Sequence, residues 1–308
     1  MINYRKATYN EILEVQKHWY AFFNEPIALS MYVRILLCNE NFDPNAFMVA
    51  IEKENIIGFC IGIKRKYHYL DYGLQEDKAW LLAIGVLPEY RRQKIGQSLL
   101  IALENYYQGN TTHMVVGSFS PLYFFAAVEE NSAAHNFFIK HDYKNDDKAY
   151  AMHLDLTTYE MPDAISDKEA ELKNNDIEVR NFIYEDTIAL LKMIKNNFSV
   201  GWFVNVQKAI ANDKATKDII IALKNKSPIG YIQKGYDLDE SRIGPFGVID
   251  SYRNAGVGTV LFHRCMTLMK KEGLARSYFK TTDEIALRFY LRNNMVIDKV
   301  MWHMSKKF

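Results

Sequence analysis

The sequence predicts an α/β protein that contains two similar folds, each with a mixed central β-sheet flanked by helices. Its 308 residues suit two domains better than one, because a domain averages about 150 residues. A glycine-containing motif at residues 85–100 recurs at residues 247–262, and an apolar-faced helix follows each copy. Duplication with divergence of a single domain accounts for both observations.

The two copies of the motif align without a gap. They read GVLPEYRRQKIGQSLL and GVIDSYRNAGVGTVLF, at a constant offset of 162 residues. Arg91 and Gly96 therefore correspond to Arg253 and Gly258. An internal repeat of this kind indicates that one structural unit occurs twice.

The remaining elements follow the same order in both halves. An extended segment and an amphipathic helix come first, at residues 2–8 and 11–23 and again at 177–182 and 185–198. Two strand-like runs separated by a turn come next, at residues 47–63 and 218–236. The motif with its helix, a strand, a second helix and a final strand complete each half.

The helix after the motif carries its apolar residues on one face. Spacings of three and four residues predict a stripe that packs in a core, formed by Ile95, Leu99, Leu100, Leu103 and Tyr106 in one copy and by Val257, Val260, Leu261, Leu268 and Met269 in the other. Together with the strands expected at 114–119 and 275–280, each helix forms a β-α-β unit with parallel strands.

The segment between the halves is polar and contains Pro162. We therefore place the boundary near residues 157–175. This gives an N-terminal domain at residues 1–157 and a C-terminal domain at residues 158–308.

Composition excludes several classes of function. The net charge of +1 shows no excess of basic residues of the kind that binds nucleic acid or a membrane surface. No apolar run is long enough to span a bilayer. The N-terminus lacks the apolar run of a signal peptide. Cys38, Cys60 and Cys265 are far apart and lack metal-ligand spacing, so we expect free thiols in a reducing cytoplasm and no bound metal.

The second copy of the motif predicts a phosphate site. Arg253, Gly256 and Gly258 form the pattern R-x-x-G-x-G at the start of a helix. A helix N-terminus offers unpaired N–H groups and partial positive charge, and glycines let a ligand approach the backbone. The Walker pattern is excluded because no lysine follows Gly258, and the dinucleotide pattern because Leu261 stands at its third glycine.

These residues resemble the acetyl-coenzyme A motif of the GNAT N-acetyltransferase superfamily, [RQ]-x-x-G-x-[GA] after a strand. The later segment DEIALRFYLRNNM is similar to that family's helix N-x-x-A-x-x-x-Y-x-x-x-G-F, through Ala286 and Tyr290. The segment NSAAHNFFIKHDY matches it through Asn131 and Ala134. The resemblance covers nearly the whole chain, twice, as in the tandem arrangement of mycothiol synthase.

The resemblance implies that loop amides bind the pyrophosphate of acetyl-CoA, with acetyl transfer to an amine by direct attack. In the C-terminal half it assigns the cofactor to Gly247, Val248, Arg253, Asn254, Ala255, Gly256, Val257, Gly258 and Thr259. In the N-terminal half the matching positions are Val86, Arg91, Lys94, Ile95, Gly96 and Asn131. The family's proton donor to the departing thiolate corresponds to Tyr290, since a phenol is protonated at neutral pH.

The two halves differ where this chemistry takes place. Lys94 stands at the position of Gly256, where its side chain either narrows the site or adds positive charge toward phosphate. Phe138 stands at the position of Tyr290 and cannot donate a proton. The spacing from loop to helix is also ten residues longer in the N-terminal half, which indicates an insertion within residues 117–130. We therefore expect catalysis in the C-terminal half, and scaffolding or regulation in the other.

The acceptor amine and the general base are less well defined. The family places its acceptor against the first helices, where Phe198, Trp202 and Phe203 suggest a partly aromatic pocket, although core packing is the favoured alternative. Asp237, Asp239 and Glu240 are candidates for the base or form a solvated turn, while His263 and His303 read as ordinary residues. Two alternatives stay open: a non-catalytic CoA-responsive binding module, and an aminoacyl transferase using charged tRNA, which the intact loop and the balanced charge disfavour.

Overall fold

The computed structural model describes residues 1–121, 123–236 and 239–308 and divides them into two compact units. Unit 1 comprises Met1–Ala149 and Val300–Phe308, and unit 2 comprises Tyr150–Lys299. The chain returns to unit 1 because its last residues, Met304–Lys307, pair antiparallel with the strand at His113–Val116. The predicted division at residues 157 and 158 differs here, since it left residues 300–308 with the C-terminal half.

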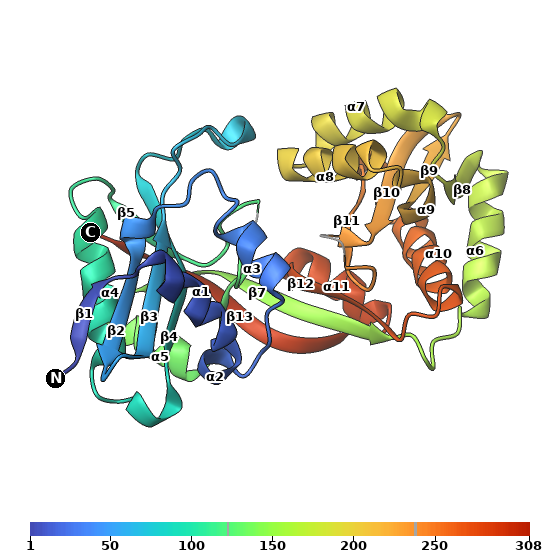
Figure 1. The fold of residues 1–308 in the computed structure, drawn as a ribbon. Coiled ribbons are helices and arrows are strands. Elements are labelled where there is room, and N and C mark those ends of the chain that lie inside the picture. The colour runs from blue at the N-terminus through green and yellow to red at the C-terminus, as the bar shows by residue number, and fades with distance from the viewer. Residues whose placement is uncertain (122, 237–238) are drawn as a thin grey trace. The chain divides into compact units, whose positions relative to one another are not determined.

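Unit 1 contains the elements predicted for the first half, shown in blue to green in Figure 1. Its helices are α1 (Tyr9–Lys17), α2 (Trp19–Phe23), α3 (Leu29–Ile35), α4 (Ile95–Tyr107) and α5 (Ala133–Lys140). Its strands are β1 (Asn3–Lys6), β2 (Phe47–Glu52), β3 (Asn55–Ile63), β4 (Lys78–Val86), β5 (His113–Val116) and β6 (Val128–Glu129), with parts of β7 (Lys144–Asp155) and β13 (Val296–Lys307).

The sheet of unit 1 has the order β1-β2-β3-β4-β5-β13. Neighbouring strands run antiparallel except β4 and β5, which are parallel, as expected for a β-α-β unit. Alternate residues of β2 enter two different cores: Phe47 and Val49 pack toward α1 and α2, whereas Met48 and Ala50 pack toward α4. The sheet is therefore covered by helices on both faces.

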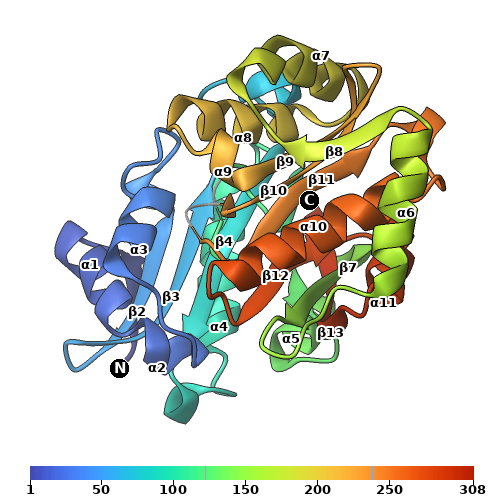
Figure 2. The ribbon, with the colours of Figure 1, turned by 90° about the vertical axis from the view of Figure 1, so that its right-hand side faces the viewer.

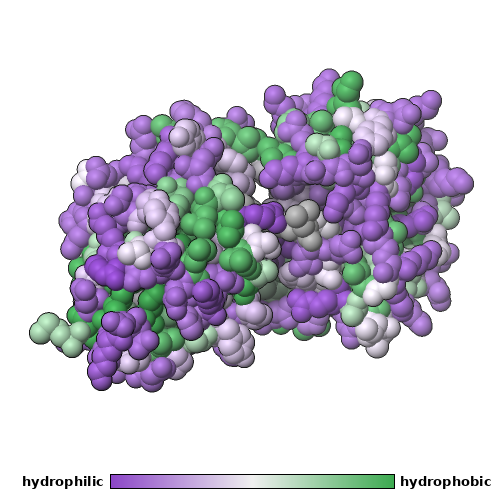
Figure 3. Space-filling model, in the orientation of Figure 1, coloured by the Kyte–Doolittle hydropathy of each residue, from purple (hydrophilic) through white to green (hydrophobic). Residues whose placement is uncertain are grey.

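Unit 2 repeats this plan (Figure 2). Its helices are α6 (Asp163–Asn174), α7 (Thr187–Asn197), α8 (Val200–Ala211), α9 (Ala215–Asp218), α10 (Val257–Lys271) and α11 (Glu284–Arg292). Its strands β8 (Ile177–Asn181), β9 (Ile219–Lys224), β10 (Ser227–Lys234) and β11 (Ile243–Val248) form an antiparallel sheet, and β12 (Arg276–Thr282) pairs antiparallel with Tyr150–Asp155 of β7. The face of unit 2 seen in Figure 3 is mainly hydrophilic, because its apolar residues lie inside.

The duplication is visible in a matching ion pair at the start of each unit. Arg5 of β1 holds Glu11 of α1 in a two-point contact at 2.6 and 2.8 Å. Arg180 of β8 holds Asp186, which precedes α7, in a two-point contact at 2.7 and 2.9 Å. In each unit the pair fixes the first strand to the start of the first long helix.

Three further features depart from the sequence reading. The helix predicted at residues 11–23 is divided at His18 into α1 and α2. The polar segment between the halves forms a helix, α6, in which Ile165 and Leu172 are buried and Pro162 precedes the first turn. The predicted stripes on α4 and α10 are buried, but Tyr106 and Leu268 at their ends are only half-buried and Tyr107 takes the inward position.

Candidate cofactor and catalytic site

The parallel strands β11 and β12 of unit 2 diverge from each other. A parallel bridge joins Arg242 to Tyr278, and the amide of Tyr278 donates to the carbonyl of Ser241 at 3.0 Å. From there β11 continues to Val248 paired with β10, whereas β12 pairs with β7. The two strands are therefore not paired with each other toward the carboxyl end of β11, and we call this gap in the strand pairing the opening.

The amide of Val248 points into this opening. The next amide, of Ile249, donates to the carbonyl of Ile229 at the β10 side, at 2.9 Å. Because successive amides of a strand point to opposite sides, the Val248 amide faces away from β10. Leu87 likewise donates to Ile57 at 3.0 Å in unit 1, so Val86 has the same orientation there.

The loop after β11 presents unpaired amides at the start of α10. Gly256 is the residue before the helix and has a φ of +85°, which only glycine adopts without strain. Asn254 also has a positive φ, of +64°. The first helical amides, of Val257, Gly258 and Thr259, have no partner within a helix, and no side chain caps them. Together with the helix dipole, these amides give this end of α10 the properties that favour an anion.

Arg253 positions the loop rather than extending toward a ligand. Its Nε donates to the carbonyl of Val248 at 3.3 Å, and its Nη2 lies 2.8 Å from the Asp250 carboxylate. In unit 1, Arg91 donates from Nε to the carbonyl of Val86 at 3.0 Å. The arginine of the motif therefore ties the loop to the end of the preceding strand in both units.

Gly258 faces Phe289 and Phe246, with room for a Cβ atom. A Cβ atom there would lie 3.5 Å from Phe289 and 3.6 Å from Phe246, which is ordinary contact. Gly96 has the same relation to Phe137, also at 3.5 Å. This correspondence aligns Phe289 with Phe137, and so Tyr290 with Phe138.

Tyr290 lies in an aromatic cluster beside the opening. Its ring centroid is 4.5 Å from that of Phe279 on β12 and 6.3 Å from that of Phe246 on β11. Burial, with a smaller contribution from Asp283, raises the pKa of the Tyr290 phenol above its ordinary value. The phenol therefore stays protonated at neutral pH and is able to donate.

The aromatic residues predicted for the acceptor lie against β11. Phe198 and Trp202 stack at a centroid distance of 4.9 Å, and a Cβ atom on Gly247 would lie 2.6 Å from Phe198 and 2.8 Å from Trp202. Both pack on the core around Tyr231, as does Phe203, yet all three remain partly exposed. Phe198 and Trp202 therefore cover β11 at Gly247, the residue before Val248.

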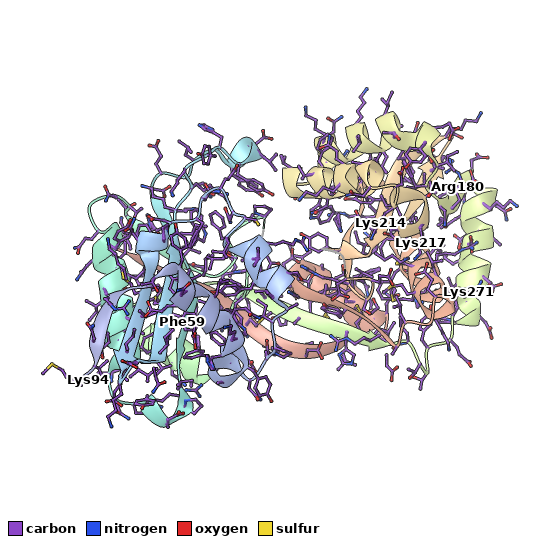
Figure 4. All side chains as sticks on the ribbon, in the orientation of Figure 1. Phe59, Lys94, Arg180, Lys214, Lys217 and Lys271 are labelled. Atoms are coloured by element: carbon purple, nitrogen blue, oxygen red, sulfur yellow. The ribbon has the colours of Figure 1, made fainter. Side chains whose placement is uncertain are left out.

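The corresponding loop in unit 1 is altered. Lys94 takes the place of Gly256 with a φ of +63°, a conformation that costs a lysine roughly 1 kcal/mol. It precedes Ile95 and Gly96 of α4 and lies at the periphery of unit 1 (Figure 4). Asn131, with a φ of +60°, donates its amide to His135 at 3.3 Å.

The first unit also lacks the phenol and has additional aromatic packing. Phe138 is 3% exposed and packs 5.2 Å from Tyr143 in the core. Within the inserted residues 117–130, Phe124 and Phe125 lie 4.8 and 6.1 Å from Trp19 of α2. The insertion therefore fills space over the first helices of its own unit.

The acidic and histidine candidates have structural partners. Asp239 accepts a hydrogen bond from the Tyr278 hydroxyl and another from the Ser241 amide at 3.0 Å, and Asp237 lies outside the described residues. Glu240 is exposed, 4.0 Å from Lys217.

The two histidine candidates are also held within the fold. His263 is buried between the Tyr159 hydroxyl at 2.9 Å and Asn293 at 3.0 Å. His303 is half-buried in β13, where burial lowers the pKa of its ring.

Two neighbouring features had escaped the sequence analysis. Lys234 is buried between Asp218 at 2.9 Å and Glu272 at 2.7 Å, and these hydrogen bonds outweigh desolvation and raise its pKa. Lys168 of α6 lies over Gly256. The spacing of Ile165 and Leu172 was the available signal for α6, but nothing in the pattern placed Lys168 beside the loop.

Among residues 1–121, 123–236 and 239–308, no cluster of three or more His, Cys, Asp or Glu side chains is arranged to hold a metal ion. Over the same ranges, no helix is both long and apolar enough to cross a membrane.

Comparisons with known proteins identify the fold and the family. Residues 43–145 match the model of an acetyltransferase (GNAT) domain, and residues 187–295 match that of the acetyltransferase (GNAT) family. A search of curated proteins finds no match.

Solved structures share the fold over the whole chain. A GCN5-related N-acetyltransferase from Sphaerobacter thermophilus matches with a TM-score of 0.70 and 14% identity, over 99% of this chain and 95% of that one. A tandem GNAT protein from the clavulanic acid biosynthesis pathway matches with a TM-score of 0.62 and 12% identity, over 100% and 98%.

A further match is the GCN5-related glucosamine N-acetyltransferase region of a fungal multi-domain GH3 β-N-acetylglucosaminidase. Its TM-score is 0.76 and its identity 20%, over 99% of this chain. The chain spans only 38% of that fungal protein. Because the two family matches together cover more than half of the residues and fall one in each half, the chain belongs to the GNAT acetyltransferase family and carries two of its domains in tandem.

Proposed function

We propose that unit 2 is an acetyl-CoA-dependent N-acetyltransferase acting on a primary amine of a small molecule or peptide. The observation that supports this proposal is the divergence of β11 and β12, with uncapped helix amides in the loop after β11 and Tyr290 packed on β12. The pyrophosphate would lie on the amides of Val257, Gly258 and Thr259. The pantetheine arm would enter between the two strands.

The chain's own groups then have defined roles. The Val248 amide donates to the thioester carbonyl oxygen and stabilises the negative charge that develops there. A neutral amine attacks the carbonyl carbon, so that a C–N bond forms and the C–S bond breaks. Tyr290 gives its proton to the departing thiolate, and the proton released by the amine restores the phenol through solvent. Phe198, Trp202 and Phe203 form the apolar wall for the acceptor.

Unit 1 has a different proposed role. Lys94 in the loop, Phe138 in place of the phenol and the insertion over Trp19 all favour a structural or regulatory domain. On this proposal the functional division follows residues 1–157 and 158–308, with β13 of the second half completing the sheet of unit 1. The free thiols of Cys38, Cys60 and Cys265 suit a reducing cytoplasm.

A non-catalytic CoA-responsive module is the second candidate, favoured by the features of unit 1. A panel of small amines and peptides, assayed with acetyl-CoA by thiol release, separates the two. Turnover well above background hydrolysis supports the enzyme. Binding of CoA by calorimetry with no turnover across a broad panel supports the module, and absence of CoA binding contradicts both.

A further inference from the structure

The side chain of Lys168 covers the first glycine of the loop in unit 2. A Cβ atom on Gly256 would collide with Cε of Lys168 and would lie 3.0 Å from its Cγ and 3.1 Å from its Cδ. The aliphatic part of the lysine therefore runs across the backbone just before α10. The ammonium group of Lys168 therefore lies near the N-terminal end of α10, where the unpaired amides are.

The helix that carries Lys168 is attached to α10. Glu169 forms an ion pair with Arg264 of α10, in which Arg264 Nε is 3.0 Å from the carboxylate. Lys270 of α10 donates to the carbonyl of Tyr159, just before α6. Figure 2 shows α6 lying across α10 within unit 2. Lys168 thus belongs to a fixed element and not to a loose linker.

The electrostatics of this position indicate an anionic partner. A cation beside a helix N-terminus is disfavoured by the helix dipole, which favours anions there. The partner Lys168 has in the structure is Glu171 of the same helix, at 2.7 Å, where the side chain of Lys168 is 35% exposed and that of Glu171 is 61% exposed. An exposed ion pair of this kind stabilises little. The ammonium group is therefore available to an anion that occupies the loop.

Unit 1 shows a second way of placing a lysine at this position. There Lys94 itself occupies the place of Gly256, directly before α4. In unit 2 that place is a glycine, and the lysine comes from α6 instead. Both loops thus carry one lysine side chain at their first glycine position, although the two lysines come from different parts of the chain.

We propose that Lys168 is a cofactor-binding residue whose ammonium group contacts the pyrophosphate of the acyl-CoA bound by unit 2. This inference rests on the proposed function of the loop and adds a residue outside its motif. The lysine would leave Glu171 for the pyrophosphate, which carries more negative charge and is held by the amides of α10. Its stem would close one side of the loop over the bound phosphates.

Calorimetric titration of the full chain with CoA tests this proposal. Lys168→Met keeps the aliphatic stem and removes the charge, and we expect a roughly ten-fold loss of CoA affinity, about 1.4 kcal/mol. Lys168→Arg should retain most of the affinity. Lys173→Met is the matched control, because Lys173 is an exposed lysine of the same helix, and its affinity should equal that of the unchanged chain.

A second ligand separates charge recognition from a general disturbance of the site. Pantetheine, which lacks the phosphates, should bind Lys168→Met as well as the unchanged chain in a competition assay. Equal CoA affinity in the Met variant would overturn the role of Lys168 and leave the proposed function intact. Tighter CoA binding would show that the lysine blocks the loop, which also overturns the proposal. Failure of the unchanged chain to bind CoA would contradict the proposed function itself.

Discussion

The ring of Tyr290 packs 4.5 Å from that of Phe279, on the strand that diverges from β11. The ring of Tyr290 therefore packs against the strand whose pairing leaves β11. Its counterpart Phe138 occupies the same helix position in unit 1 and is buried against Tyr143. The two units therefore share a scaffold, but unit 1 has a phenylalanine where unit 2 has a phenol.

Replacing Tyr290 with phenylalanine tests this difference. Tyr290→Phe keeps the ring in its aromatic cluster and removes the hydroxyl, so we expect turnover to fall by roughly 10²–10⁴-fold if proton donation limits the reaction. CoA affinity should change little, since the phosphates bind at the loop. Steady-state kinetics with the best amine of the panel measure the first quantity and calorimetry the second. An unchanged rate would remove Tyr290 from the mechanism.

Gly256 permits a test that separates strain from ligand contact. Gly256→Ala should cost roughly 1–2 kcal/mol of stability, because the residue has a φ of +85°, and should also weaken CoA binding through its collision with Lys168. Gly256→Glu should abolish CoA binding, since it adds bulk and negative charge beside phosphate. Gly273→Ala is the control, because Gly273 has a φ of +83° with open space around it. It should lose similar stability and no CoA affinity.

The sequence predicted the repeated elements because their signals are local. The period of the apolar residues in α4 and α10 and the turn between β2 and β3 do not depend on distant contacts, and these elements formed as expected. The loop at Gly256 was equally local, since its residues are consecutive. How Gly256 and Tyr290 act on a cofactor remains a prediction.

Other features depended on long-range packing and could not be predicted. Whether β13 joins its own half or the sheet of unit 1 is decided by pairing with β5, which lies about 190 residues earlier in the chain. The position of Lys168 over Gly256 likewise depends on how α6 packs on α10. The polar composition of residues 163–174 favoured a linker, because only Ile165 and Leu172 mark the buried face.

The paired ions at the start of each unit predict how stability depends on pH. The Arg5 hydrogen bond, followed by smaller contributions from Thr8, outweighs burial and lowers the pKa of Glu11 to about 2 from 4.5. Arg180 likewise lowers the pKa of Asp186. A folded-state pKa below the unfolded value contributes stability that is present above pH 4.5 and lost as the pH falls toward 2.

Glu11→Gln should therefore lower the free energy of unfolding by about 1 kcal/mol at pH 7 and have little effect near pH 2. Urea unfolding monitored by circular dichroism at several pH values measures this difference. Glu40→Gln, at an exposed position in unit 1, serves as the control and should change neither value. A Glu11→Gln effect that is the same at pH 7 and pH 2 would contradict the assignment to the Arg5 pair.

The asymmetry between the units is tested by giving unit 1 the missing phenol. Phe138→Tyr should create no second active site, because Lys94 still alters the loop and Phe124 and Phe125 still pack over Trp19. The added hydroxyl enters a core position that is 3% exposed, so we expect a loss of about 1–3 kcal/mol of stability.

The decisive measurement is turnover in the Phe138→Tyr, Tyr290→Phe double variant, which should match that of Tyr290→Phe alone. Recovered turnover would show that unit 1 binds acetyl-CoA productively. If substitution of Gly96 abolished turnover while Tyr290→Phe left it intact, the catalytic unit would be the first.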